Sequence, residues 1–220
     1  MTNNVSFDVR RGEVLGVIGP NGAGKTTLFG LLAGNVEASS GSIEFDGVEV
    51  TRLPSNERAR LGIGRTFQVP RPFTHMSVRN NLLTAARFGG GLSAQLAELW
   101  IDEVLELTLL KDRAQFLAGR LPLLHRKRHE LARALALKPK LLLIDEVAAG
   151  LTDEEVNEFI DIVRSIRKLG VTVIWIEHVM KTMLTATDRV LALNGGAVLA
   201  IGEPEKVLGG EEVKRVYLGA

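Results

Sequence analysis

The sequence predicts an α/β fold, because apolar strand patterns and helical patterns alternate along the chain. The segments Leu141–Ile144 and Val171–Glu177 are nearly continuous apolar runs rich in branched residues, which is typical of parallel strands covered on both faces. Between them, residues 153–169 have the periodicity of an amphipathic helix. A third apolar run, Val14–Ile18, precedes a helical pattern at Lys25–Ala33. We therefore expect a core built on a mainly parallel sheet.

Shorter patterns predict antiparallel elements beside this sheet. Apolar and polar residues alternate at Val5–Arg10 and at Ser42–Asp46, which indicates half-buried strands in a small flanking antiparallel sheet. Leu61–Phe67 is a further candidate strand. Asp188–Leu193 and Ala197–Ile201 lie on either side of a glycine-containing turn, and this order favours a hairpin.

A helical subdomain is expected at residues 72–129, between two parts of the core at residues 1–71 and 130–220. From Ser77 to Leu117 the pattern is helical, and Gly89–Gly91 interrupts it as a flexible connector. Five large apolar residues of this stretch share one helical face: Leu96, Leu99, Trp100, Val104 and Leu107. That face could be a partner surface, but we expect internal core, because large apolar residues are usually buried.

The composition excludes several classes of protein. The 220 residues, 45% of them hydrophobic, suit one large domain or a domain with a subdomain. The net charge of +1 gives no overall attraction to nucleic acid or acidic lipid, and the lack of cysteine excludes a disulfide framework. No apolar run approaches the ~20 residues that span a bilayer, and the polar start shows no signal peptide. We therefore expect any membrane role to depend on a partner protein.

The strongest functional signal is a glycine-rich loop between the first apolar run and its helix. Its residues, in the pattern G-x-x-x-x-G-K-[ST], are Gly19, Pro20, Asn21, Gly22, Ala23, Gly24, Lys25 and Thr26, with Thr27 next on the helix. Glycines let the backbone curl around a phosphate group and point its N–H groups inward. Lys25 can reach the β- and γ-phosphates, the Thr26 hydroxyl can ligate Mg²⁺, and the helix N-terminus adds positive dipole. The loop therefore predicts a P-loop NTPase core.

Two further runs of the core are followed by polar residues, which we expect at the sheet edge where ligands of open α/β sheets bind. Asp145 and Glu146 follow one run, and His178 follows the next. A buried Asp145 needs a partner, and Mg²⁺ supplies one directly or through water. Glu146 can polarise the attacking water, a role worth about 10²–10⁴ in rate, and His178 can orient that water. We therefore expect catalytic roles for Lys25, Glu146 and His178.

The segment His125–His129, which reads His-Arg-Lys-Arg-His, allows two sharper interpretations. Its two histidines have the spacing i, i+4 and could hold a metal, and its basic cluster could meet nucleic acid. No third ligand is evident, and no aromatic stacking pattern accompanies the charges. We therefore expect a solvated helix face and no nucleic-acid partner.

Taken together, these residues resemble the nucleotide-binding subunits of ABC transporters over nearly the whole chain. Gly19–Thr26 matches the Walker A motif, Leu141–Glu146 matches Walker B with its catalytic glutamate, and Ala149–Asp153 is similar to the D-loop. His178 matches the switch histidine. Gln68 matches the Q-loop glutamine, which the resemblance implies contacts Mg²⁺ beside the bound ATP and senses the membrane partner.

Longer segments are similar to one subgroup, the ATP-binding subunits of branched-chain amino-acid importers. They are Arg65–Gln68, Pro72–Phe73, Met76–Leu82, Glu130–Ala136 and Val216–Gly219. The resemblance implies a head-to-tail dimer with two ATP molecules at its interface, each held by Walker A and B of one subunit and the signature motif of the other. It also implies transmembrane permease subunits, an extracytoplasmic solute-binding protein as an indirect partner, and a place at the cytoplasmic face of a bacterial or archaeal cell membrane.

The chain departs from the family pattern in three places. The signature motif is normally close to Leu-Ser-Gly-Gly-Gln, whereas residues 121–125 read Leu-Pro-Leu-Leu-His. Proline lacks the serine hydroxyl and a backbone N–H, and Leu123 and Leu124 carry side chains where glycines let phosphate approach. Val147 replaces the proline that usually follows the catalytic glutamate. The family also begins earlier, with an aromatic residue that stacks on adenine, and Phe7 does not match it.

The sequence therefore predicts the ATP-hydrolysing motor subunit of an ABC importer for branched-chain amino acids. Because the signature is altered, we expect a heterodimer with a related subunit more than a homodimer. The alternatives are an exporter motor, for example for a lipid, a regulatory nucleotide-binding subunit with little turnover, and a soluble ABC ATPase that acts on DNA or ribosomes. The last class usually carries a long coiled-coil insertion or a tandem second cassette, and this sequence shows neither.

Overall fold

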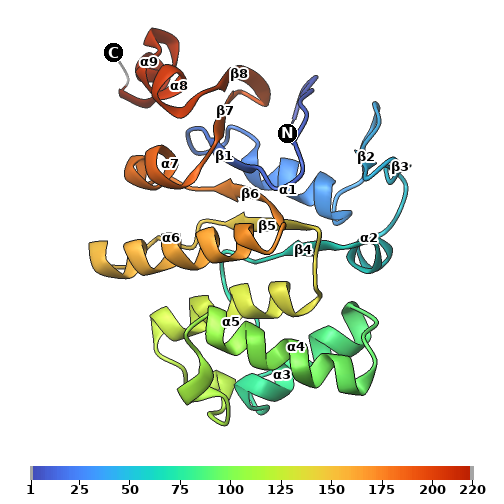
Figure 1. The fold of residues 1–220 in the computed structure, drawn as a ribbon. Helices are drawn as coiled ribbons and strands as arrows, with labels where there is room; N and C mark the ends of the chain where they lie inside the picture. Colours follow the sequence, from blue (N-terminus) through green and yellow to red (C-terminus); the bar gives the residue numbers. More distant parts are fainter. Residues whose placement is uncertain (1, 219–220) are drawn as a thin grey trace.

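The computed structural model describes residues 2–218, and its centre is a six-stranded sheet with the order β4-β5-β6-β1-β7-β8 (Figure 1). The strands are β1 (Val14–Ile18), β4 (Ile63–Arg65), β5 (Leu141–Asp145), β6 (Thr172–Ile176), β7 (Arg189–Asn194) and β8 (Ala197–Gly202). Neighbouring strands from β4 to β7 pair in parallel, and β8 pairs antiparallel with β7. The mainly parallel sheet and the hairpin predicted from the sequence are both confirmed.

Both faces of the sheet are covered, which explains the continuous apolar runs. Leu141 and Leu143 belong to the apolar cluster that contains helix α1 (Lys25–Ala33), whereas Leu142 and Ile144 belong to the cluster on the other face. Helices on that other face include α5 (Leu123–Ala136), α6 (Asp153–Lys168) and α7 (Met180–Ala186). Successive residues of a strand point to opposite faces, so each strand needs apolar residues at every position.

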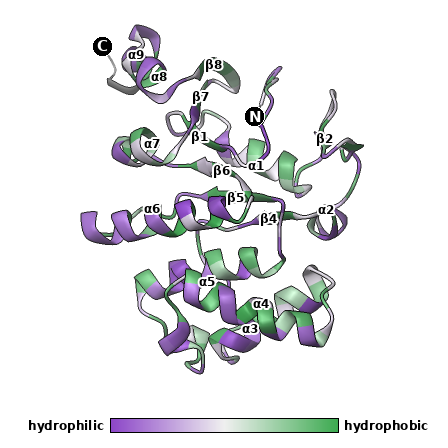
Figure 2. Ribbon diagram, in the orientation of Figure 1, coloured by the Kyte–Doolittle hydropathy of each residue, from purple (hydrophilic) through white to green (hydrophobic). Residues whose placement is uncertain are grey.

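Helix α6 connects β5 to β6 and begins at a capping box. The Thr152 hydroxyl accepts a hydrogen bond from the Glu155 N–H at 3.3 Å, and the Glu155 carboxylate accepts one from the Thr152 N–H at 2.8 Å. These two bonds satisfy N–H groups that a helix start leaves without partners. Figure 2 shows hydrophobic and hydrophilic residues alternating along α4, α5 and α6, as expected of helices with one buried face.

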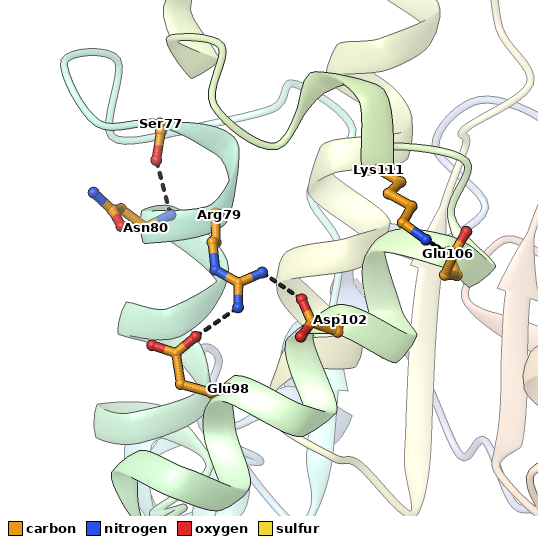
Figure 3. Close-up of polar contacts among 7 residues, drawn as sticks. All are labelled: Ser77, Arg79, Asn80, Glu98, Asp102, Glu106 and Lys111. Atoms are coloured by element: carbon orange, nitrogen blue, oxygen red, sulfur yellow. Dashed lines mark hydrogen bonds and ion pairs between the residues drawn. The ribbon is translucent and has the colours of Figure 1, made fainter.

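A helical layer lies below the sheet in Figure 1 and consists of α3 (Val78–Thr84), a π-helical turn (Ala85–Gly89), α4 (Ala94–Leu107) and α5. Arg79 of α3 forms ion pairs with Glu98 at 2.6 Å and Asp102 at 2.5 Å on α4 (Figure 3). The Trp100 indole N–H donates to the Leu135 carbonyl at 3.2 Å and ties α4 to α5. Two ion pairs and one indole hydrogen bond therefore supplement the apolar packing between these helices.

The expected apolar face of α4 is only partly core. Val104 is fully buried and Trp100 and Leu107 are half-buried, but Leu96 and Leu99 are 57% and 65% exposed. The expectation of internal core is therefore wrong for Leu96 and Leu99. The face that packs against the neighbouring helices is rotated from the expected stripe, and its buried residues are Ala97, Ile101, Val104 and Leu105.

The prediction of a strand at Val5–Arg10 is wrong. Val5, Phe7 and Val9 do pack on the cluster that contains α1, so the alternation reports burial correctly, but no described strand pairs with this segment. The flanking antiparallel sheet consists of β2 (Glu44–Phe45) and β3 (Val48–Glu49) alone. A burial pattern of period two cannot by itself supply a hydrogen-bonding neighbour.

The remaining helices are α2 (Ser55–Leu61), α8 (Pro204–Gly209) and α9 (Glu211–Leu218). Gly219, the last residue of the C-terminal segment used in the family resemblance, lies outside the described residues. Within residues 2–218, no helix combines the length and the apolar character needed to cross a bilayer.

Candidate functional site

The phosphate-binding loop joins β1 to α1 as the sequence predicts. Residues 19–24 form the loop, and Lys25, Thr26 and Thr27 form the first turn of α1. Gly22 and Gly24 have φ angles of +82° and +100°, which side chains other than hydrogen rarely tolerate. A Cβ atom on Gly19 would lie 2.5 Å from the Leu193 carbonyl oxygen on β7. The loop geometry therefore requires glycine at these three positions.

The side chain of Lys25 extends from α1 into this loop, and the residue is only 6% exposed. Its Nζ donates hydrogen bonds to the carbonyls of Gly19 at 2.7 Å and Pro20 at 3.2 Å. Burial lowers the pKa of Lys25, and the negative charges of Glu146 and Asp145 oppose that shift. The ammonium group of Lys25 is therefore held between the carbonyls of the loop and the carboxylates of Asp145, at the end of β5, and Glu146, which follows it.

Three of the predicted site residues meet in one hydrogen-bonded group. The Gln68 Nε2 donates to one carboxylate oxygen of Glu146 at 2.5 Å, and His178 Nε2 lies 2.5 Å from the other. Gln68 follows β4, Glu146 follows β5 and His178 follows β6 closely. The carboxyl ends of adjacent parallel strands thus bring an amide, a carboxylate and an imidazole together.

Glu146 has a strained backbone. Its φ angle of +45° is in the left-handed region, which is uncommon for a residue with a side chain and costs about 1–3 kcal/mol. Its N–H donates to the Ile176 carbonyl at 3.0 Å, so β6 supports this conformation. Such strain persists only where the surroundings fix the chain, and it clusters at functional sites.

Asp145 is 3% exposed, and the Arg65 guanidinium lies 3.4 Å from its carboxylate. Burial raises the pKa of Asp145, the Arg65 charge lowers it, and the Glu146 charge raises it. The buried carboxylate is therefore partly compensated by the Arg65 guanidinium at 3.4 Å and by the charge of Lys25. Arg65 belongs to the segment that resembles the family, but no sequence pattern indicates its ion pair with Asp145.

The donors available to a metal ion are oxygen atoms. Thr26 is exposed at the start of α1. The side-chain N–H of Gln68 donates a hydrogen bond to Glu146, which leaves the Gln68 amide oxygen for another partner. Within residues 2–218 no group of three or more His, Cys, Asp or Glu side chains gathers as a metal cluster. One carboxylate with hydroxyl and amide oxygens fits Mg²⁺, which commonly uses few protein ligands and completes its shell with phosphates and water.

The expectation of a solvated helix face at 125–129 is wrong for the last three residues of the segment, although Arg126 is exposed and His125 is half-buried. Lys127, Arg128 and His129 are at most 6% exposed, because α5 packs against α4 on one side and against the sheet on another. Burial, together with the charge of Arg133, lowers the pKa of His129 to about 4. The spacing of Lys127, Leu131 and Leu135 along one helical face was the signal for this burial, since residues four apart lie on the same side.

Two buried charged residues beside the site were not predicted. The Lys127 Nζ donates to the Val147 carbonyl at 2.6 Å and also to the Ala149 carbonyl. Glu177, 1% exposed, accepts a hydrogen bond from the Ala148 N–H at 2.7 Å. Burial raises the pKa of Glu177. A carboxylate at the end of a buried strand was the sequence signal for Glu177, as it was for Asp145.

The segment at the signature position forms the start of α5. The N-cap is Pro122, which makes no side-chain capping bond, and the first helical hydrogen bond joins the Arg126 N–H to the Pro122 carbonyl at 2.8 Å. Leu123 is half exposed, and its Cδ2 would lie 3.6 Å from a Cβ on Gly150. The start of α5 therefore lies beside the loop that follows Glu146.

Comparisons with known proteins show one family over nearly the whole chain. A sequence model described as ABC transporter matches residues 2–149. A high-affinity branched-chain amino acid transport ATP-binding protein of Pseudomonas aeruginosa is 36% identical over 236 residues, which cover 99% of this chain and 91% of that protein. A lipopolysaccharide export system ATP-binding protein of Escherichia coli is 37% identical over 223 residues, with 100% and 91% covered.

Solved structures are similar over the same span. A nucleotide-free ATP-binding cassette from an ABC transporter has a TM-score of 0.89 at 28% identity, covering all of this chain and 93% of that one. The ADP conformation of an ATP-binding cassette of an ABC transporter has a TM-score of 0.89 at 29% identity, with 100% and 92% covered. The fold of the whole chain therefore has counterparts among the ATP-binding cassettes of ABC transporters.

Proposed function

The chain belongs to the ABC transporter family, and from this premise we propose that it is the ATP-hydrolysing subunit of a bacterial or archaeal importer for branched-chain amino acids. Members of this family bind ATP and hydrolyse it to drive transport. The observation that carries the hydrolytic role is the contact of Glu146 with both Gln68 and His178, next to the buried Lys25, and the 36% identity to a branched-chain amino acid transport protein supports the importer. The subunit would act at the cytoplasmic face of the membrane through permease subunits.

The residues at the site divide into binding and chemical roles. Residues 19–24 would surround the phosphates with main-chain N–H groups, and Lys25 would exchange a carbonyl contact for the γ-phosphate. Glu146 would accept the proton of the attacking water, for which one of its two contacts must open. His178, half exposed, is the partner that can turn toward the γ-phosphate. Gln68 would keep the Glu146 carboxylate in place.

Mg²⁺ would be held by the Thr26 hydroxyl, the Gln68 amide oxygen and the Asp145 carboxylate, directly or through water. The buried carboxylate of Asp145, with Arg65 at 3.4 Å as its cation, supports this assignment. When bound, the ion would neutralise charge that develops on the phosphate oxygens.

We further propose that the working assembly is a heterodimer with a related ATP-binding subunit. In a homodimer, the start of α5 would face the partner's ATP with Pro122, Leu123 and Leu124, which offer no side-chain donor. Removing even one donor that stabilises transition-state charge costs about 10²–10³ in rate in other enzymes. A partner with serine and glycines at these positions would complete one composite site, formed with this chain's Lys25 and Glu146.

A second candidate is the motor of a lipid exporter. The observation that favours it is the 37% identity to a lipopolysaccharide export system ATP-binding protein, which is as high as the identity to the amino-acid transport protein. Both candidates use the same site on this chain. The transported solute is chosen by the membrane partner.

Uptake and co-purification together test the proposal. Cells that lack this chain should lose uptake of labelled leucine, isoleucine or valine, and the wild-type gene should restore it while the Glu146→Gln variant should not. The tagged chain, purified from membranes, should carry permease subunits and a second ATP-binding subunit. Undiminished uptake of all three amino acids in the deletion strain would reject the importer, and loss of lipopolysaccharide export would favour the exporter.

A further inference from the structure

The loop directly after Glu146 is held at three consecutive residues by two buried charged side chains. Lys127 donates to the carbonyls of Val147, at 2.6 Å, and of Ala149. Glu177 accepts from the N–H of Ala148, the residue between them, at 2.7 Å. Three main-chain groups that would otherwise lack a partner in this irregular segment are thus fixed.

The two side chains come from different parts of the fold. Lys127 belongs to α5, whereas Glu177 directly follows β6 and also accepts a hydrogen bond from the His178 N–H at 3.2 Å. Both are nearly fully buried, at 6% and 1% exposed. Burial lowers the pKa of Lys127 and the Glu177 charge raises it, so the two charges support one another across the loop. A buried ammonium is costly unless its donors are used, and here carbonyls use them.

The arrangement matters because of the backbone of Glu146. Its left-handed φ of +45° is not a conformation that a glutamate adopts without support. The hydrogen bond from the Glu146 N–H to the Ile176 carbonyl fixes the backbone on the N-terminal side of the Glu146 Cα atom. The contacts of Lys127 and Glu177 fix the backbone on its C-terminal side. The carboxylate of Glu146 is thereby directed to Gln68 and His178.

We propose that Lys127 and Glu177 are positioning residues, which hold the main chain of residues 147–149 so that Glu146 keeps the geometry required for hydrolysis. This inference rests on the proposed role of Glu146. It also gives α5 a mechanical link to the hydrolytic residue, because the helix that starts at the signature position carries Lys127 one turn later. A shift of α5 relative to the sheet would move the loop behind Glu146.

The test compares Lys127→Met with Lys127→Arg and with Lys168→Met as a matched control. Lys168 is an exposed lysine at the end of α6, so its replacement removes the same charge away from the loop. In the assembly purified from membranes with its partner subunits, Lys127→Met should lower kcat at least about tenfold, since small displacements of a catalytic group are that costly. ATP affinity by calorimetry and KM should stay within about threefold, because the phosphate loop is untouched. Lys127→Arg should recover most of kcat, since a guanidinium can donate to two carbonyls.

Hydrogen exchange gives a second readout that does not depend on turnover. The Ala148 amide should exchange faster in Lys127→Met and in Glu177→Gln than in the wild type and in Lys168→Met. If Lys127→Met does not fold, Glu177→Gln decides the matter by the same two measurements. Unchanged kcat and unchanged Ala148 exchange in folded Lys127→Met, or in Glu177→Gln if Lys127→Met does not fold, would overturn the inference.

Failure of this inference can be told apart from failure of the proposed function. If Glu146→Gln is slow while Lys127→Met keeps full kcat, Glu146 is catalytic and the positioning role is rejected. If Glu146→Gln turns over as fast as the wild type, the proposed function of Glu146 itself is wrong, and the inference is overturned with it.

Discussion

Acidification should destabilise this fold through His129. The side chain is fully buried in α5, and within the described residues neither ring nitrogen has a hydrogen-bond partner. Burial, helped by the charge of Arg133, lowers the pKa of His129 from 6.5 to about 4. The unfolded chain therefore takes up a proton near pH 6.5, whereas the folded chain resists it until the pH approaches 4.

The magnitude follows from the difference between these two pKa values. At about 1.4 kcal/mol per pKa unit, a shift from 6.5 to about 4 removes roughly 2 kcal/mol of unfolding free energy by pH 5 and roughly 3 kcal/mol below pH 4. Burial has the opposite effect on the stability contributed by three acidic residues, because it raises the pKa values of Glu130, Asp145 and Glu177. A group that binds a proton more readily in the folded state than in the unfolded state adds stability as the pH falls. The contribution of His129 is therefore measured as a difference between two proteins.

Urea unfolding of the wild type and of His129→Leu at pH 7 and pH 5 isolates this contribution. Leucine has a similar volume, and it replaces two unpaired buried nitrogens, so the variant should be no less stable at pH 7. Between pH 7 and pH 5 the wild type should lose about 2 kcal/mol more than the variant. His75→Leu, at an exposed histidine, serves as the control and should follow the wild type. Equal pH dependence in the wild type and His129→Leu would refute the reasoning.

Three further predictions concern the site. Glu146→Gln should bind ATP in calorimetry but release phosphate at least about a hundredfold more slowly, since the shape is kept and the base is lost; undiminished release would remove Glu146 from the mechanism. Lys25→Ala should lose ATP affinity, because a charge-assisted phosphate contact is removed, and wild-type affinity would count against the loop. The triple variant Pro122→Ser, Leu123→Gly, Leu124→Gly should raise steady-state ATPase of the isolated chain at least tenfold, on the scale of ~1.4 kcal/mol in a barrier. High activity of the unmodified chain with no gain in the variant would contradict the idea of an impaired homodimer.

Much of the site was predictable because its parts are contiguous in the chain. Gly19–Thr26 needs only the strand before it and the helix after it, so a local pattern is sufficient to locate the loop. Asp145, Glu146 and His178 could be grouped because parallel strands end at one sheet edge. The contact of Gln68 with Glu146 was not predictable in this way, since it depends on β4 being the neighbour of β5.

Patterns of burial were less reliable where the neighbour was unknown. The alternation at Val5–Arg10 correctly indicated a half-buried segment, but strand pairing needs a partner that the local pattern does not contain. Leu96 and Leu99 share a helical face with Val104, and the structure buries a different face of α4 because α3 and α5 lie on that side. Periodicity therefore gave the type of element, and packing gave its orientation.

The sequence by itself determined the phosphate loop, the alternation of strands and helices, and the polar residues that end β5 and β6, because each depends on adjacent residues and on backbone geometry. Only the tertiary structure decided the fate of the basic segment at 125–129. Its charges suggested solvent, yet the apolar residues one and two turns further along α5 bind that helix to the core and carry Lys127 inside with them. Once inside, the ammonium satisfies carbonyls of the loop after Glu146, which lie 20 and 22 residues away in the sequence. The charge of Lys127 could not predict this contact, because the packing of the whole helix face determines which side chains are buried. A buried ammonium must then bind the acceptors that the tertiary structure places beside it.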